Sequence, residues 1–226
     1  MTMEQLARSI DAQLTDDVGW ILQYVPFAAH LTADDEALHD AYYIRHRIET
    51  VKRIRLTAKT DALALASLID IDYEAAREWN HYTAQEMNHD KLFIRDLEHH
   101  GYTEASILSV KTFPATIQMV QYLNRSVQAV GALPAIAYSL FVEWNSERAS
   151  THVVARAEKS FSRLHVAGSK AHQKIDEDAQ HYADILRLAD RLLKQGSSAD
   201  ALSIYLKDVA LFFANYFMQL YQSTIR

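Results

Sequence analysis

Glycine and proline, the residues that most often turn or interrupt a chain, are scarce in this sequence. There are 5 Gly and 3 Pro among 226 residues, whereas an average chain of this length carries roughly three times as many. A β-sandwich needs a turn roughly every 8–12 residues, and a dinucleotide-binding α/β fold needs glycine-rich loops. Both are therefore excluded, and the long uninterrupted segments favour an all-α protein.

The rest of the composition narrows the class of protein further. The absence of cysteine excludes a disulfide framework, a thiolate nucleophile, a zinc ribbon and an iron–sulfur cluster. A hydrophobic fraction of 49% is enough for one sizeable core, so we expect residues 1–226 to form a single domain. The net charge of −6 argues against nucleic acid as a partner. We expect no membrane span and no signal peptide, and hence a cytoplasmic protein.

Helix-capping and helix-breaking residues divide the chain into about seven to nine predicted helices of one bundle. Thr32 with the acidic residues 34–36 is typical of a helix start, and Gly101 is typical of a helix end. The expected ranges are 3–14, 18–30 interrupted at Pro26, 32–69 with a break near 59–60, 73–100, 114–129, 134–159, 165–194, and 199 to near the C-terminus.

Eleven histidines are many for such a chain, and several follow an acidic residue by three positions. In a helix this spacing places a carboxylate and an imidazole on one face, as in the Glu-x-x-His units of di-iron bundles. The spacing alone is not selective, because five pairs have it: Glu36/His39, Glu78/His81, Glu86/His89, Asp96/His99 and Asp178/His181.

The position of each pair on its helix separates these five. The stripe through Glu86 and His89 is mostly bulky apolar or aromatic, and the stripe through Asp178 and His181 is apolar apart from Lys174 and the pair itself. The other three pairs lie on solvated faces or at helix ends. Buried carboxylates are costly unless a cation compensates them, so the two selected pairs are candidate metal ligands.

Two further carboxylates are candidates for the same site. Glu143 closes the apolar run 135–142, and Glu147 is the alternative one turn later. Glu49 precedes Glu86 by one helix, but it lies among basic residues, so an ordinary surface ion pair explains it about as well. A hydrogen-bonded core role remains the alternative for each histidine taken alone.

The order of these residues is similar to that of ferritin-like di-iron proteins, and it resembles the heme-oxygenase-like di-iron oxidases more closely. Members of that family carry a Glu near a His in one helix, a single Glu some fifty-odd residues later, and a terminal helix with His-x-x-x-Asp-x-x-His. Here His89 and Glu143 are 54 residues apart, and Asp178 follows Glu143 by 35. Leu31-Thr32, Tyr42-Tyr43 and the segment 86–101 also resemble helices of this family, and the resemblance covers residues 30 to 190.

The sequence departs from the family pattern at one position. Lys174 stands where the first histidine of the terminal motif is expected, and His172 lies two residues earlier. Either one metal ion is short of a ligand, or the helix is distorted so that His172 reaches the site, or Lys174 replaces a ligand.

The resemblance implies an enzyme that binds two Fe²⁺ ions per chain, with Mn as an option for one site, and uses O2 as co-substrate. It would oxidise a small organic molecule, such as an amino acid or fatty acid derivative in natural-product biosynthesis. The implied partners are this substrate and an electron donor, with a homodimer as an open option. Arg or Lys facing the pocket would indicate a carboxylate-bearing substrate. The aromatic residues that would wall the pocket, unless they are simply core, are Trp79, Tyr82, Tyr138 and Trp144.

Three other functions remain open. A cofactor-less enzyme of the same fold, similar to TenA-type thiaminase II or the quinone-cofactor synthase, would lack the ligand set. A heme-degrading oxygenase would need a proximal histidine near the N-terminus, for which His30 and His39 are candidates. A ferritin-like iron-handling protein or a purely structural helical protein would need no organic substrate.

Overall fold

The apolar stretch that begins at Leu133 forms the first half of a central helix. A computed structural model of the chain describes residues 1–33 and 37–226, the side chains of residues 177–179 excepted. The described ranges contain no strand, and two 3-10 helices cover Ala28–Leu31 and Arg163–Val166. The α-helices are α1 (Met3–Tyr24), α2 (Asp40–Ile71), α3 (Tyr73–His99), α4 (Glu104–Ser109), α5 (Pro114–Val130), α6 (Leu133–Ser160), α7 (Ala167–Ala179), α8 (His181–Lys194) and α9 (Ala199–Thr224).

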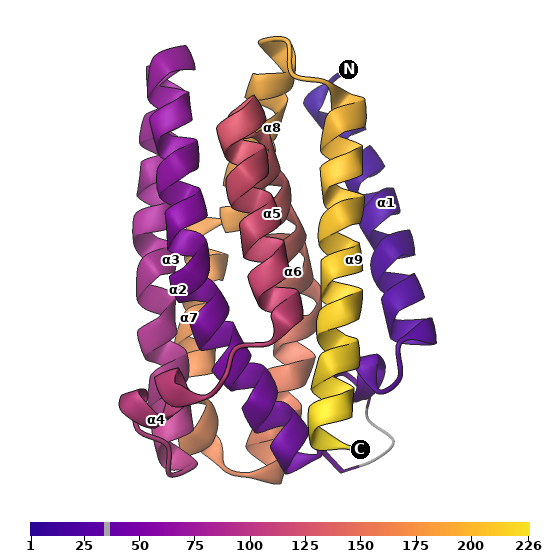
Figure 1. The fold of residues 1–226 in the computed structure, drawn as a ribbon, viewed down its shortest axis with the longest axis vertical. Coiled ribbons are helices and arrows are strands. Elements are labelled where there is room, and N and C mark those ends of the chain that lie inside the picture. Colours follow the sequence, from indigo (N-terminus) through magenta and orange to yellow (C-terminus); the bar gives the residue numbers. More distant parts are fainter. Residues whose placement is uncertain (34–36) are drawn as a thin grey trace.

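The long helices run along the length of one bundle. Helices α2 and α3 lie side by side along one side of it, α1 and α9 lie along the other, and α5, α6 and α8 occupy the space between them (Figure 1). The described part of the chain thus forms one all-α domain, as predicted. None of its helices combines the length and the apolar character that crossing a membrane requires.

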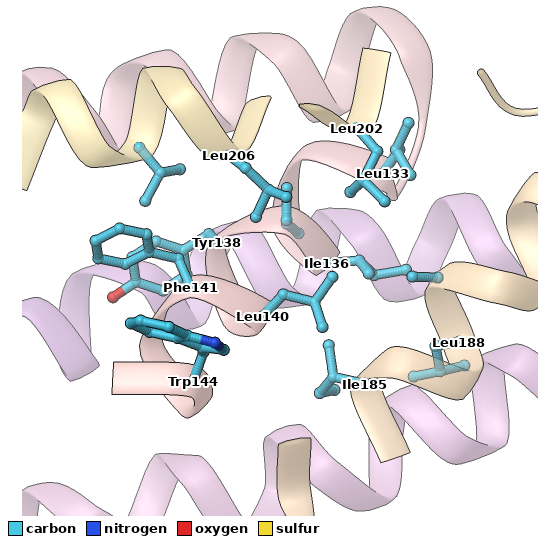
Figure 2. Close-up of a cluster of buried hydrophobic side chains, with 14 of the residues drawn as sticks. Leu133, Ile136, Tyr138, Leu140, Phe141, Trp144, Ile185, Leu188, Leu202 and Leu206 are labelled. Atoms are coloured by element: carbon cyan, nitrogen blue, oxygen red, sulfur yellow. The ribbon is translucent and has the colours of Figure 1, made fainter. Parts of the chain in front are cut away.

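Helices α6, α8 and α9 share a hydrophobic core, part of which Figure 2 shows. Ile136 and Leu140 of α6 pack in the same cluster as Ile185 and Leu188 of α8, and all four are fully or almost fully buried. Each such side chain stabilises the fold by about 1.5–3 kcal/mol. This packing fixes α6 against α8. It therefore also fixes the distance between the polar residues that follow the apolar run of α6 and those that precede the apolar run of α8.

Several helix ends lie where the sequence predicts them. Asp72 caps α3 by accepting hydrogen bonds from two backbone N–H groups of its first turn. Gly101, which follows the end of α3, has a φ of 85°, a left-handed value that glycine adopts at little cost. Helices α5 and α6 each have a proline in the first turn.

The N-terminal helix boundaries differ from the expectation. Helix α1 continues past residue 14 because Val18 and Ile21 extend its apolar stripe, and it ends just before Pro26. Helix α2 begins at Asp40 with His39 as its N-cap, not at Thr32, which follows the first 3-10 helix. The acidic residues 34–36 lie outside the described part of the chain.

Three further expectations about helix boundaries are wrong. Helix α2 has no break near 59–60, and the segment expected to be a loop before Pro114 contains α4. The segment 165–194 is not one helix, because Gln180 adopts a left-handed conformation with φ 53° and ψ 44° and separates α7 from α8. This last difference changes which side chains meet in the interior.

Candidate metal centre

Helices α3, α6, α7 and α8 bring six side chains with metal-ligating atoms together. They form two groups of three, and within each group the ligand atoms lie within 4.8 Å of one another. All donors are nitrogen or oxygen, the set that suits iron, manganese or zinc rather than softer ions. The groups are His89, His172 and Asp176, and Glu86, Glu143 and His181.

Two carboxylates contact histidines of both groups. Glu86 Oε1 lies 3.1 Å from His89 Nδ1 and 3.3 Å from His181 Nδ1. Asp176 Oδ2 lies 2.8 Å from His172 Nδ1, and its Oδ1 lies 3.4 Å from His181 Nδ1. Metal–ligand bonds of about 2.1 Å place neighbouring ligands of one ion about 3 Å apart, so these separations fit ligands that share a pair of ions.

The orientation of His181 is fixed by a partner outside the two groups. Its Nε2 hydrogen-bonds Gln85 Oε1 at 2.8 Å. With Nε2 as the donor, the Nδ1 lone pair faces the carboxylates of Glu86, Asp176 and Glu143, the last at 3.9 Å. A lone pair turned toward carboxylate oxygens is unfavourable by itself, but it is the arrangement that metal-bound histidines adopt when a neighbouring side chain fixes the tautomer.

Several of these buried atoms have no hydrogen-bond partner among the described residues. They are Glu86 Oε1, Asp176 Oδ1, His181 Nδ1 and both ring nitrogens of His89. Buried polar atoms are normally paired, and unpaired ones destabilise a fold. Their concentration at one point fits bound cations, so the residues present are suited to hold a pair of metal ions.

The protonation of the carboxylates reflects the same crowding. Burial raises the pKa of Glu143 well above the ordinary range of a carboxyl group, and the charges of Glu86 and Asp176 raise it further. Burial also acts to raise the pKa of Asp176, but the neighbouring histidines His172, His181 and His89 outweigh it and hold this pKa far below its usual range. A divalent cation would favour the ionised form of all three carboxylates.

Polar side chains around the centre complete its hydrogen bonds. Tyr82 donates a hydrogen bond to Glu143 Oε1 at 2.7 Å, and Ser146 donates one to Asp176 Oδ2 at 3.1 Å. Burial raises the pKa of the Tyr82 hydroxyl well above its usual value, and the charges of Glu143 and Glu86 act in the same direction. Tyr82 is therefore held as a neutral donor.

The structure brings four of the residues selected from sequence into these groups, namely Glu86, His89, Glu143 and His181. Glu147, the alternative to Glu143, is in neither group, and about half of its side chain is exposed.

The terminal motif differs from the expectation. The side chain of Asp178 lies outside the described part of the structure. His172 reaches the site, whereas Lys174 is exposed. Among the described residues, Asp176 is the carboxylate of this group, and it follows His172 by four residues, the spacing expected for the first two residues of the motif but two positions earlier. Two more residues separate Asp176 from His181 than the expected motif has between its acidic residue and its last histidine. The left-handed conformation of Gln180 interrupts the helix between them, so that His181 still reaches the site.

Glu49 does not join the cluster. Its fully buried carboxylate accepts hydrogen bonds from the Phe113 N–H at 3.1 Å and the Thr116 hydroxyl at 2.8 Å, and it pairs with Arg45 at 2.9 Å. It is therefore neither a surface ion pair nor part of the two groups, because the loop before α5 and the first turn of α5 cover it.

Sequence reasoning missed Asp176, Gln85 and Asp61. Asp176 could have been found from its i, i+4 spacing to His172, and Gln85 from its place beside Glu86. Asp61 lies on α2 and lines the same cavity as Glu86. Burial and the charge of Glu86 raise the pKa of Asp61 to about 7.

A cavity of about 270 Å³ extends from the cluster into the bundle. Glu86 and His172 line it, as do two of the predicted pocket residues, Tyr82 and Tyr138. Trp79 and Trp144 do not line it. They are buried in the core, where the Trp79 indole donates to the Asp61 carbonyl at 3.0 Å and the Trp144 indole to Asp11 at 2.9 Å.

The two histidines considered for heme have other contacts. His39 accepts a hydrogen bond from the Tyr42 N–H as the N-cap of α2. His30 accepts one at Nε2 from the His39 N–H at 2.8 Å and stacks on Phe27. Neither residue lines the cavity.

The comparisons with known proteins concern the fold. No protein-family model matches the sequence, and curated protein sequences give no match. A domain of unknown function with a heme oxygenase-like fold from Shewanella denitrificans superposes with a TM-score of 0.77 at 19% identity, covering 99% of this chain and 93% of that one. A TenA homolog from Pseudomonas syringae pv. tomato superposes with a TM-score of 0.69 at 14% identity, covering 99% and 95%. The chain therefore has the heme oxygenase-like fold that its motif order implied.

Proposed function

We propose that the protein is an oxygen-activating oxidase or oxygenase that holds two iron ions and acts on a small organic molecule. The observation that carries this proposal is the pair of three-residue groups with buried ligand atoms that lack hydrogen-bond partners. Mixed carboxylate and imidazole ligands suit Fe²⁺, with Mn²⁺ as an option for one of the ions. That the protein acts on a small organic molecule is supported by the cavity, which Glu86 and His172 line directly.

The chain's own residues would have distinct roles in this function. The group His89, His172 and Asp176 would hold one ion, and the group Glu86, Glu143 and His181 the other. When bound, the two ions would supply electrons to dioxygen, and an electron donor would return the ions to their reduced state afterwards. Gln85 fixes the ring of His181, and Tyr82 positions Glu143.

Metal analysis after anaerobic loading with Fe²⁺ tests this proposal. We expect two irons per chain and an absorbance transient on exposure to O2. Asp176→Asn should lose iron, because Asp176 contacts histidines of both groups, whereas the matched variant Glu147→Gln should keep both ions. Loss of iron in Asp178→Asn but not in Asp176→Asn would instead support Asp178, the ligand predicted when residues 165–194 are taken as one helix.

The result that would overturn the proposal is equally specific. If no metal binds, and if Glu86→Ala and His89→Ala leave the stability of the protein unchanged, the cluster is not a metal centre. A cofactor-less activity on the same fold would then be the better explanation. Iron uptake and oxidation without turnover of any organic substrate would favour the iron-handling alternative.

A further inference from the structure

One face of α2 is polar although it looks into the interior of the bundle. His46, Thr50, Arg53, Thr57 and Asp61 are spaced three or four residues apart and therefore form one stripe. All five line the cavity that reaches the candidate metal centre. The interior stripe of a bundle helix is normally apolar, so this stripe is unusual and indicates a wall that contacts a polar ligand.

Two arginines that line the cavity, Arg53 of this stripe and the nearby Arg47, lack an anionic partner. Arg53 is 9% exposed and Arg47 is 8% exposed, and neither forms an ion pair with a described carboxylate. Arg53 Nη1 and Arg47 Nε are buried without a hydrogen-bond partner among the described residues. The Arg53 guanidinium instead lies over the rings of Phe213 and Tyr216, at 5.1 and 5.6 Å from their centroids.

Neighbouring arginines of α2 show what a paired arginine looks like in this protein. Arg45 pairs with Glu49 at 2.9 Å, and Arg55 pairs with Asp90 at 2.7 Å and Glu104 at 2.6 Å. Both of these point away from the cavity, since neither lines it. The arginines without a carboxylate are thus the ones that face the cavity, and buried guanidinium groups are expected to be paired.

The remaining walls restrict what kind of anion fits. Ile21, Leu22, Phe141 and Phe217 line the cavity and present apolar surface. No lysine is among the described residues that line it, and Asp61 and Glu86 near the centre would repel a doubly charged phosphate. A single carboxylate matches the planar fork of one guanidinium.

Tyr138 connects the two ends of the cavity. Burial raises its pKa to about 12, the charge of Arg53 opposes this increase, and the charges of Asp61 and Glu86 add to it. Tyr138 lines the same cavity as Arg53, Asp61 and Glu86, so its hydroxyl shares that space with both the arginine and the metal-centre carboxylate. A ligand of modest length on Arg53 would extend past Tyr138 toward Glu86.

We infer that the cavity binds an organic monocarboxylate with an apolar body, with its carboxylate on Arg53 and its opposite end directed toward Glu86 and His172. That this ligand is the substrate rests on the proposed function. The carboxylate-binding end is built from the chain alone and does not require metal.

Calorimetric titration of the full chain with octanoate tests this inference. The titration is carried out without metal and again with Mn²⁺, so that binding to the arginines is separated from binding to an ion. We expect Arg53→Gln to weaken octanoate binding by at least about 10-fold in both conditions, because a charge-assisted bidentate contact is lost. Arg53→Lys should recover part of this loss. Arg55→Gln, on the same helix but outside the cavity, should bind octanoate like the unaltered protein.

Neutral and cationic probes complete the test. Octan-1-ol should bind more weakly than octanoate and equally to the unaltered protein and Arg53→Gln, and any octylamine binding at the carboxylates Asp61 and Glu86 should not weaken in Arg53→Gln. The thermal midpoint of ligand-free Arg53→Gln should be unchanged or higher, because an unpaired buried charge has been removed, so unfolding would not explain weaker binding.

Two results would overturn the inference. The first is octanoate affinity that is the same in Arg53→Gln and in the unaltered protein, and the second is absence of octanoate binding in a protein that holds two irons. In the second case the proposed oxidase would stand and its substrate would be of another class. Arginine-dependent octanoate binding in a chain that takes up no iron would support this inference and refute the proposed function.

Discussion

Replacing Glu49 would distinguish a structural carboxylate from a metal-binding one. Glu49 is fully buried and holds three partners from different parts of the chain: the Arg45 guanidinium, the Phe113 N–H and the Thr116 hydroxyl. Glu49→Ala would leave these donors without an acceptor in the interior. Arg45 would retain one hydrogen bond, to the Lys111 carbonyl at 2.8 Å.

The magnitude follows from these contacts. Removing one partner of a buried ion pair costs about 3–5 kcal/mol. Because Arg45 keeps a carbonyl partner, we take the lower end for the ion pair, about 3 kcal/mol, and add about 1 kcal/mol for each of the two orphaned neutral donors. For a chain of this length each kcal/mol lowers the melting temperature by about 2–4 °C, so we expect a decrease of roughly 10–20 °C.

Urea unfolding, calorimetry and iron content measured on the same preparations provide the assay. Glu49→Ala should lower the urea midpoint with an unchanged m-value and should still bind two irons at temperatures where it is folded. Glu49→Gln keeps an acceptor and should lose roughly half as much stability. If Glu49→Ala lost iron but kept its stability, the carboxylate would be a ligand and the reasoning from its hydrogen bonds would be refuted.

Two further predictions concern the packing of α7 and the pH dependence of stability. Gly168→Ala should destabilise the protein by about 3 kcal/mol or more and weaken iron binding, because an added Cβ would lie 1.9 Å from the Leu92 carbonyl oxygen and push α7 off α3. Urea unfolding and iron content measure these two effects, and an unchanged urea midpoint would contradict the prediction. Burial and two neighbouring arginines hold the pKa of His46 well below its usual value, so the unfolded chain binds a proton that the folded chain does not, and stability falls as the pH drops below about 6.5. His46→Gln, in which the amide can still accept from Tyr216, should make the loss of stability between pH 7.5 and 5.5 smaller by about 1 kcal/mol in urea unfolding, and an identical pH profile would contradict this.

The position of a residue around its helix, which depends only on the local sequence, gave the predictions that agree best with the structure. It placed Glu86 and His89 on an interior face because the residues one turn before and after them are apolar, and α3 is indeed continuous through both. It also identified Glu143 at the end of an apolar run, and α6 carries that run into the core. These residues lie in uninterrupted helices, so spacing along the sequence translates directly into position.

The errors arose where position depends on contacts between distant segments. Glu49 has basic sequence neighbours and therefore resembles a surface residue, but the start of α5, more than sixty residues away, covers it. The break at Gln180 has no sequence signal, because glycine and asparagine are the usual residues in a left-handed conformation and glutamine is not. A continuous helix was therefore assumed, whereas Asp178, which was selected with it, has a side chain outside the described part of the structure and stays a prediction.

The helix break at Gln180 is what allows Asp176 and His181 to meet. Residues five apart in one continuous helix point about 140° away from each other, whereas here their ligand atoms are 3.4 Å apart. The other end of α7 is fixed by Asp96, whose carboxylate accepts hydrogen bonds from the Gly168 and Ser169 N–H groups at 2.6 and 2.7 Å. No apolar side chain described in α7 is fully buried, so this helix is positioned mainly by polar contacts at its ends and at the cluster. A strained left-handed residue typically destabilises a fold by about 1–2 kcal/mol. In this chain the strain lies next to His181, where it sets the separation between the two candidate ligand groups.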